Sequence, residues 1–132
     1  MAKPDYTAML RALSEHHVDF IVVGGAGAVL LGAPIITFDL DIVHSTEAGN
    51  VERLLAALDS LDACHRIQGE RRTRPQASPR RSSGHQLLMT CHGPLDLLGA
   101  IGRGRSYTDL IQRTVELPVA DDVVVRVLAP RH

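Results

Sequence analysis

Three aspartates have the residue type and the spacing that could do chemistry. Asp39 and Asp41 stand two positions apart beside an apolar run, and Asp96 lies inside a later apolar run, residues 95–98. Alternate residues of a strand point to the same face, so Asp39 and Asp41 would bring two negative charges together. Such charges repel unless a cation lies between them, and Mg²⁺ or Mn²⁺ takes carboxylates together with substrate phosphates. The spacing therefore predicts metal-assisted chemistry on a nucleoside triphosphate.

Two glycines, Gly24 and Gly25, follow the apolar run 20–23 and precede an apolar segment, residues 26–31. This pattern predicts a strand, a tight turn and a short helix. Glycine lets a phosphate approach the backbone, and the first turn of a helix offers N–H groups to an anion. The alternative is a turn that binds nothing. A dinucleotide-binding fingerprint is not expected, because Leu30 stands where that motif needs its last glycine.

Hydrophobic periodicity predicts an alternating chain of helices and strands. Helices are expected over residues 5–17, 46–61 and 107–113, with Thr46 as the N-cap of the second. Strands are expected over residues 20–23, 39–44, 64–67, 86–91, 95–98, 115–117 and 123–128, with turns at 92–94 and 120–122. The sequence predicts an α/β (α+β) fold, with one mixed β-sheet and helices packed on it.

Composition and charge favour a single globular domain. The chain has 132 residues, is 45% hydrophobic and has a net charge of −1, which argues against bulk electrostatic binding of nucleic acid. Cys64 and Cys91 have no C-x-x-C spacing, so neither a zinc site nor a disulfide framework is expected. No apolar run reaches membrane-spanning length, and the N-terminus has no signal pattern. We therefore expect one cytoplasmic domain over residues 1–132, without a membrane partner.

Arginines are concentrated in one segment of the chain. Residues 66–81 hold six Arg and one Glu, and the stretch 69–84 is also rich in Pro and Ser, so we expect a flexible basic loop there. The loop either contacts the phosphates of an RNA acceptor or of the triphosphate, or is only a solvated loop. Arg103 and Arg105 follow Asp96 and are candidates for nucleotide binding, with an ordinary exposed turn as the alternative.

At these residues the chain resembles the nucleotidyltransferase superfamily, in particular the minimal nucleotidyltransferases and AbiEii-like toxins of bacteria. The matching stretches are residues 20–28 (FIVVGGAGA), 37–43 (TFDLDIV) and 93–99 (GPLDLLG), and the resemblance spans roughly residues 5–128. It implies that Asp39, Asp41 and Asp96 are catalytic and bind Mg²⁺ (or Mn²⁺), with Asp96 also helping to activate the acceptor hydroxyl.

The same resemblance implies that Gly24 and Gly25, with Thr37, hold the nucleotide. The implied reaction moves a nucleoside monophosphate from a nucleoside triphosphate to an acceptor and releases pyrophosphate. RNA (including tRNA ends), a protein or a small molecule would be the acceptor. The resemblance also implies a toxin–antitoxin role with an antitoxin protein as partner, and a homo-oligomer stays open.

A second interpretation is a non-catalytic nucleotide-binding or interaction domain that retains the fold. Members of the superfamily often carry a basic residue before the D-x-D strand, where this chain has residues 35–38 (IITF). Many also hold the triphosphate with a Lys in helices beyond the last strand, whereas Lys3 is the only Lys of this sequence. These departures favour the non-catalytic interpretation, and the three aspartates favour the enzyme.

Overall fold

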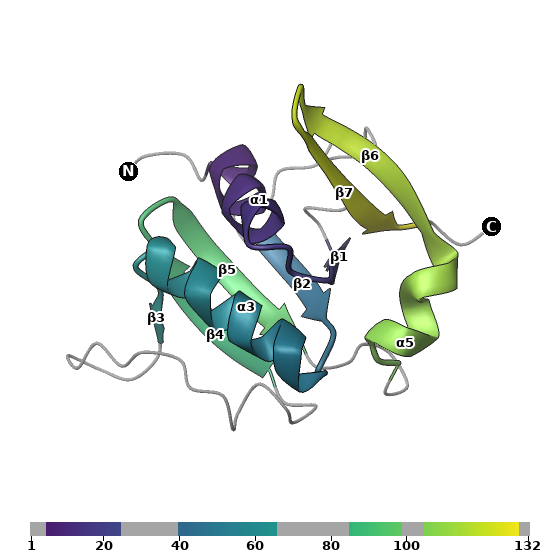
Figure 1. Ribbon diagram of the computed structural model, residues 1–132, viewed down its shortest axis with the longest axis horizontal. Helices are drawn as coiled ribbons and strands as arrows, with labels where there is room; N and C mark the ends of the chain where they lie inside the picture. The colour runs from purple at the N-terminus through teal and green to yellow at the C-terminus, as the bar shows by residue number, and fades with distance from the viewer. Residues whose placement is uncertain (1–4, 25–39, 66–84, 99–104, 130–132) are drawn as a thin grey trace.

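The structure is a computed structural model that describes residues 5–24, 40–65, 85–98 and 105–129. Its elements in chain order are α1 (Tyr6–Glu15), β1 (Phe20–Val23), β2 (Leu40–His44), α3 (Ala48–Ser60), β3 (Cys64–His65), β4 (His85–Thr90), β5 (Gly93–Leu98), α5 (Tyr107–Leu110), the 3₁₀ helix η1 (Ile111–Arg113), β6 (Thr114–Ala120) and β7 (Val123–Leu128). Figure 1 shows their arrangement. The predicted α+β class is confirmed.

The strands of the described ranges form one mixed sheet in the order β3-β4-β5-β2-β1-β7-β6. The β2–β5 and β1–β7 pairs are parallel, and the other four pairs are antiparallel. Each parallel pair joins strands that are far apart in the sequence. The strand that contains Asp41 and the strand that contains Asp96 are therefore neighbours in the middle of the sheet.

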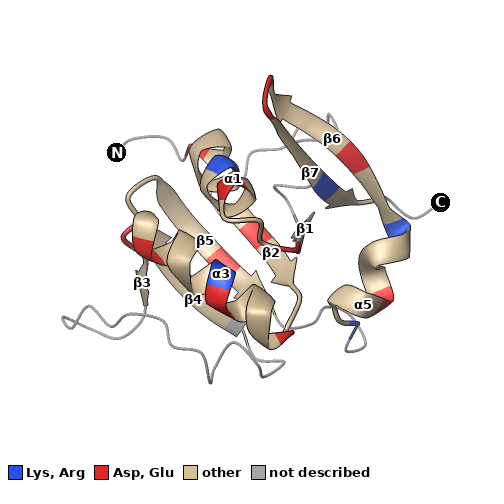
Figure 2. Cartoon of the chain, viewed as in Figure 1, with Lys and Arg blue, Asp and Glu red and all other residues tan. Residues whose placement is uncertain are grey.

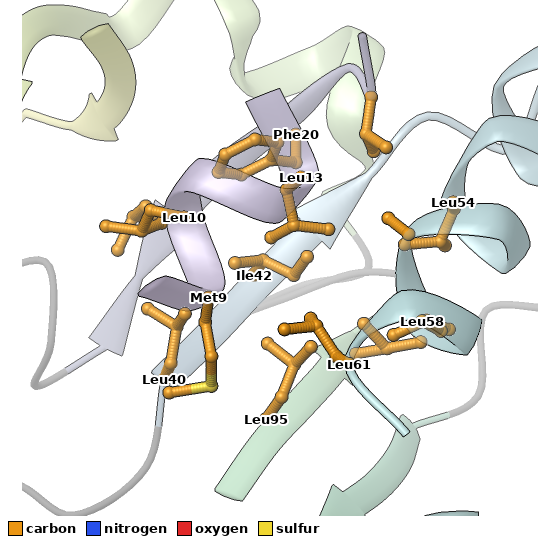
Figure 3. Close-up of a cluster of buried hydrophobic side chains, with 14 of the residues drawn as sticks. Met9, Leu10, Leu13, Phe20, Leu40, Ile42, Leu54, Leu58, Leu61 and Leu95 are labelled. Carbon is orange, nitrogen blue, oxygen red and sulfur yellow. The ribbon is translucent and has the colours of Figure 1, made fainter. Parts of the chain in front are cut away.

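Helices α1 and α3 lie side by side over one face of the sheet (Figure 1). Alternate residues of β2 and β5 point toward these helices, because successive side chains of a strand point to opposite faces. The main core forms between the helices and this face. Figure 3 shows its centre, with Met9, Leu10 and Leu13 of α1, Leu54 and Leu58 of α3, and Leu40, Ile42 and Leu95 of the sheet.

The opposite face of the sheet has a smaller apolar cluster. Ile21, Val23 and Val43 are buried there against Leu110 of α5. Tyr107 and Ile111 pack on the edge of this cluster. Helix α5 and η1 thus cover part of the second face, the face that also contains the odd-numbered residues of β2.

The N-caps of α1 and α3 are set in different ways, and that of α3 differs from the prediction. Asp5 caps α1 as its side chain accepts a hydrogen bond from the Ala8 N–H at 3.0 Å. Helix α3 begins at Ala48 with Glu47 as its N-cap, so the prediction of Thr46 is wrong. Tertiary hydrogen bonds explain the shift, because the Ser45 N–H donates to Asp19 O and Ser45 O accepts from the Asn50 side chain. These bonds hold Ser45 at the end of β2 and delay the first helical turn.

The hairpin between β4 and β5 also differs from the prediction. The expected turn at 92–94 is wrong, because the turn is Cys91–His92 and Gly93 already pairs with Thr90. Gly93 has a φ of +127°, a conformation that favours glycine. The Thr90 hydroxyl closes the turn by donating to Gly93 O and accepting from the His92 N–H. A local side-chain hydrogen bond therefore shortens the loop to two residues.

Several predicted features lie outside the described residues. They are the helix at 26–31, the first residue of the 39–44 strand, the end of the 64–67 strand and the basic loop at 69–84. Strand β6 is longer than the predicted 115–117, and the 107–113 helix divides into α5 and η1. In the part of the chain that the structure describes, no helix is long and apolar enough to cross a membrane.

Candidate functional site

Asp41 and Asp96 lie directly opposite each other on the parallel strands β2 and β5. Adjacent strands of a sheet are about 4.8 Å apart, so paired residues on the same face place their side chains in contact range. Leu40 and Ile42 on β2, and Leu95 and Leu97 on β5, point into the main core. The two carboxylates therefore share the other face of the sheet.

The carboxylate pair sits inside a row of four residues that crosses the sheet. Leu87 of β4 pairs with Asp96, Asp96 pairs with Asp41, and Asp41 pairs with Val23 of β1. Apolar side chains thus flank the two acids on both sides of the row. Figure 2 shows an acidic position on each of β2 and β5, and neither strand contains Lys or Arg. The row concentrates negative charge between apolar neighbours.

Both carboxylates are withdrawn from solvent. Asp96 is only 7% exposed, and Asp41 is half-buried. One oxygen of each carboxylate, Oδ1, is buried. Burying charged oxygens is costly unless other groups compensate, and two negative groups in register add their mutual repulsion. A cation placed between them would offset both costs.

Gly24 lies beside Asp41 at the end of β1. It follows Val23 and has a φ of +69°, in the left-handed region that glycine adopts without strain. A Cβ atom added to Gly24 would be 2.6 Å from Oδ2 of Asp41. Gly24 of the predicted turn and Asp41 of the predicted carboxylate site are therefore next to each other.

The remaining predicted site residues have different positions. Arg105 immediately precedes Ser106, the N-cap of α5. The pKa of Asp109 in that first turn is lowered mainly by hydrogen bonds from Ser106, with a smaller effect of the Arg105 charge. The positive charge of Arg105 is therefore close to the start of α5. The following predicted residues lie outside the described ranges: Gly25, Thr37, Asp39 and Arg103.

Among the residues that the structure describes, no group of three or more His, Cys, Asp or Glu side chains could hold a metal ion. The described carboxylate pair supplies two of the three predicted ligands, and Asp39 is the third. Two carboxylates and substrate phosphates are a typical ligand set for Mg²⁺. The residues present therefore fit a magnesium ion that is shared with a phosphate ligand.

One buried polar residue near the site strands had no signal in the sequence. Asn50 of α3 is 1% exposed, and its side chain donates to Asp19 O and Ser45 O and accepts from the Asp19 N–H. These bonds tie the start of β1 to the end of β2. An Asn in a helix has no sequence pattern that would reveal such bonds, since they depend on tertiary contacts.

Comparison with known proteins supports the fold. No protein-family model matches the sequence, and no curated protein matches it. Among solved structures, the chain is similar to a protein from Thermotoga maritima described as a "putative nucleotidyltransferase", with a TM-score of 0.57 and 13% sequence identity. The match covers 93% of this chain and 74% of the other. The chain therefore has a nucleotidyltransferase-like fold.

Proposed function

We propose that this chain is a metal-dependent nucleotidyltransferase of the minimal or AbiEii-like type. The observation that carries the proposal is the register of β2 and β5, which sets Asp41 beside Asp96 on one sheet face. The similar fold of the Thermotoga maritima protein adds support. Paired acids on adjacent strands suit nucleotidyl transfer, which depends on positioning and on charge neutralisation.

In this proposal Asp41 and Asp96, with Asp39, hold Mg²⁺ or Mn²⁺, and Gly24 lies at the phosphate side of the cluster. The bound cation would neutralise charge on the phosphates during transfer. A bond forms between the acceptor oxygen and the α-phosphorus as the bond to the β-phosphate oxygen breaks, and pyrophosphate leaves. Asp96 accepts a hydrogen bond from the acceptor hydroxyl and draws its proton away. The more exposed Asp41 would hold the cation that accompanies the incoming nucleotide.

The acceptor in this proposal is an RNA end, a protein or a small molecule. A role as the toxin of a toxin–antitoxin pair would make an antitoxin its protein partner. Gly25, Thr37, Arg103 and Arg105 are the proposed further contacts of the nucleotide. Substituting each of these four residues in a transfer reaction tests its contact with the nucleotide.

The direct test is a transfer reaction with each radiolabelled nucleoside triphosphate, Mg²⁺ or Mn²⁺, and total RNA or cell lysate as the acceptor. We expect release of pyrophosphate and label on one acceptor class. Asp96→Asn should abolish turnover and spare much of the nucleotide binding, whereas Asp41→Asn should abolish both. Asp59→Asn is the matched control, because Asp59 is an exposed residue of α3, the helix on the opposite sheet face.

The results separate the enzyme from the second interpretation. Binding of a triphosphate without product, for every triphosphate and acceptor, would identify a non-catalytic nucleotide-binding domain. Equal turnover in the wild type and in Asp41→Asn would contradict the metal role. A wild-type protein that neither binds nor turns over any triphosphate would reject both nucleotide functions.

A further inference from the structure

Gly24 and Asp41 are in closer contact than the sequence suggests. A Cβ atom built on Gly24 would lie 2.6 Å from Oδ2, 3.4 Å from Cγ and 3.5 Å from Cβ of Asp41. All three atoms belong to one side chain, so the Asp41 side chain lies along the backbone of Gly24. A separation of 2.6 Å is shorter than real Cβ contacts allow. A methyl group at position 24 would therefore force the carboxylate group of Asp41, the flexible end of that side chain, to move.

The directions open to Asp41 are limited by its neighbours. The residue is the second of β2, and this strand lies between β1 on one side and β5 on the other. Its register partner on β5 is Asp96, another carboxylate, and its partner on β1 is Val23. Displacing Asp41 away from Gly24 would change the separation of the two carboxylates. The absence of a side chain at Gly24 thus affects the distance between the Asp41 and Asp96 carboxylates.

We propose that Gly24 is a positioning residue for the Asp41 carboxylate, and that its lack of a side chain sets the spacing at which Asp41 and Asp96 share a cation. The inference rests on the proposed function for its cation, and it differs from a role in which Gly24 only gives a phosphate room. The positive φ of Gly24 contributes a separate cost to any substitution, since L-residues rarely adopt φ of +69°. The test must therefore separate backbone strain from the contact with Asp41.

A double-mutant cycle makes this separation, because it removes each partner alone and together. Melting temperatures are measured for Gly24→Ala in three backgrounds: wild type, Asp41→Ala and Asp41→Asn. Backbone strain is the same in all three. The contact with the Asp41 side chain is absent in Asp41→Ala and is kept in Asp41→Asn, which has nearly the same shape. We expect Gly24→Ala to lower the melting temperature by at least about 3 °C less in Asp41→Ala than in the other two backgrounds.

If Gly24→Ala lowers the melting temperature equally in all three backgrounds, the inference is overturned. If Gly24→Ala does not fold, the double variant Gly24→Ala/Asp41→Ala decides the question. Recovery of folding in the double variant supports the contact, and failure of both variants to fold overturns it.

Cation binding is the second readout, measured as the Mn²⁺ affinity of the folded protein by calorimetry. We expect Gly24→Ala to weaken Mn²⁺ binding at least tenfold. Gly49→Ala is the matched control, because among the described residues a Cβ at Gly49 in α3 would meet only Arg53 Nη1, at 3.4 Å. The control should bind Mn²⁺ within about twofold of the wild type. Unchanged affinity in Gly24→Ala would overturn the positioning role.

The two readouts also distinguish this inference from the proposed function. If the wild type binds neither Mn²⁺ nor a Mg²⁺–triphosphate complex, the proposed function fails, and the cation part of the inference fails with it. The double-mutant cycle then still reports whether Gly24 makes room for Asp41. If the wild type binds Mn²⁺ and the cycle is additive, only the role of Gly24 is rejected.

Discussion

Asp96 faces Asp41 across the parallel β2–β5 pair, with one carboxylate oxygen of each residue buried. Two negative groups so placed repel each other, and the proposed cation would reduce that repulsion. We therefore expect Asp96→Asn to raise the free energy of unfolding by roughly 1 kcal/mol in the presence of a chelator, since one charge of the pair is removed. Excess Mg²⁺ should reverse this order, because only the wild type keeps both carboxylates of the proposed metal site. Urea unfolding with and without Mg²⁺ measures both effects, and Asp59→Asn should change neither.

Leu97 is the neighbour of Asp96 on β5 but points into the main core, where it is 1% exposed. Leu97→Ala should lower the free energy of unfolding by about 2–5 kcal/mol, the usual cost of a buried Leu-to-Ala cavity. The Mn²⁺ affinity of the folded protein should stay near the wild-type value, because the carboxylates are on the other face. Denaturant unfolding and calorimetry on the same sample check the two expectations. If fully folded Leu97→Ala binds Mn²⁺ much more weakly than the wild type, the two faces of the sheet are coupled.

Asn50 links three segments of the chain through its side-chain amide. Asn50→Ala would leave the Asp19 N–H and Ser45 O without this buried partner, whereas Asp19 O keeps its hydrogen bond from the Ser45 N–H. We expect a loss of roughly 2–4 kcal/mol in the free energy of unfolding, because unsatisfied buried polar groups cost about 1–3 kcal/mol each and some will find water. Ser60→Ala, which removes a single hydrogen bond to Ala57 O within α3, is the comparison and should cost far less. Similar losses in both variants would contradict a linking role for Asn50.

The ionisation of Tyr107 in α5 should affect the stability of the fold at high pH. Burial, and then the negative charge of Asp19, raise the pKa of Tyr107 above its ordinary value of 10.0, while Arg126 opposes the shift. The neutral phenol is therefore favoured in the folded state. Its contribution to stability is complete below the unfolded pKa and is lost as the pH rises through the folded pKa. Tyr107→Phe should flatten the decline of stability above about pH 10, and melting curves from pH 8 to 11 would show the difference.

The ion pair of Arg11 and Asp122 should affect the stability of the fold at low pH. The guanidinium of Arg11 donates to both carboxylate oxygens of Asp122 at 2.6 Å, which joins α1 to the turn between β6 and β7. This hydrogen bonding lowers the pKa of Asp122 below its ordinary value of 3.8. The stabilisation is complete above that ordinary value and is lost as the pH falls through the lowered pKa.

Both partners are exposed, so the effect should be small and screened by salt. Asp122→Asn should lower the melting temperature by roughly 1–3 °C at neutral pH, and the difference from wild type should vanish well below pH 3.8. An unchanged difference at low pH would mean that the carboxylate charge is not responsible. Asp121→Asn, at the adjacent turn residue, is the control for a general change of surface charge.

The sequence predicted the fold class well, because the spacing of apolar residues reports which face of each helix or strand is buried. The strand at 20–23 was correct for that reason, and the helix expected over residues 5–17 is found as Tyr6–Glu15. The start of α3 was wrong, since the tertiary hydrogen bonds of Ser45 override the local capping preference of Thr46. Local patterns cannot reveal bonds to residues distant in the chain.

The carboxylates could be selected from the sequence, because acids in apolar runs are unusual. Their register could not, since neither Asp41 nor Asp96 indicates which residue it will face. The contact of Gly24 with Asp41 was equally hidden, because it depends on how β1 and β2 pair. The predicted roles of all these site residues stay predictions, and Asp39, Gly25, Thr37 and Arg103 also lie outside the described ranges.

The pairing of β1 with β7 has a consequence for how the chain is made. Val22 pairs with Val127, roughly one hundred residues later, and β7 supplies Val123, Val125 and Val127 to the main core. On the ribosome the N-terminal strands emerge first, so β1 must wait with an exposed edge for β7. Contacts between residues so far apart in sequence also slow folding. The nascent chain is therefore most exposed to aggregation and to chaperones after its acid-bearing strands have been synthesised and before β7 arrives.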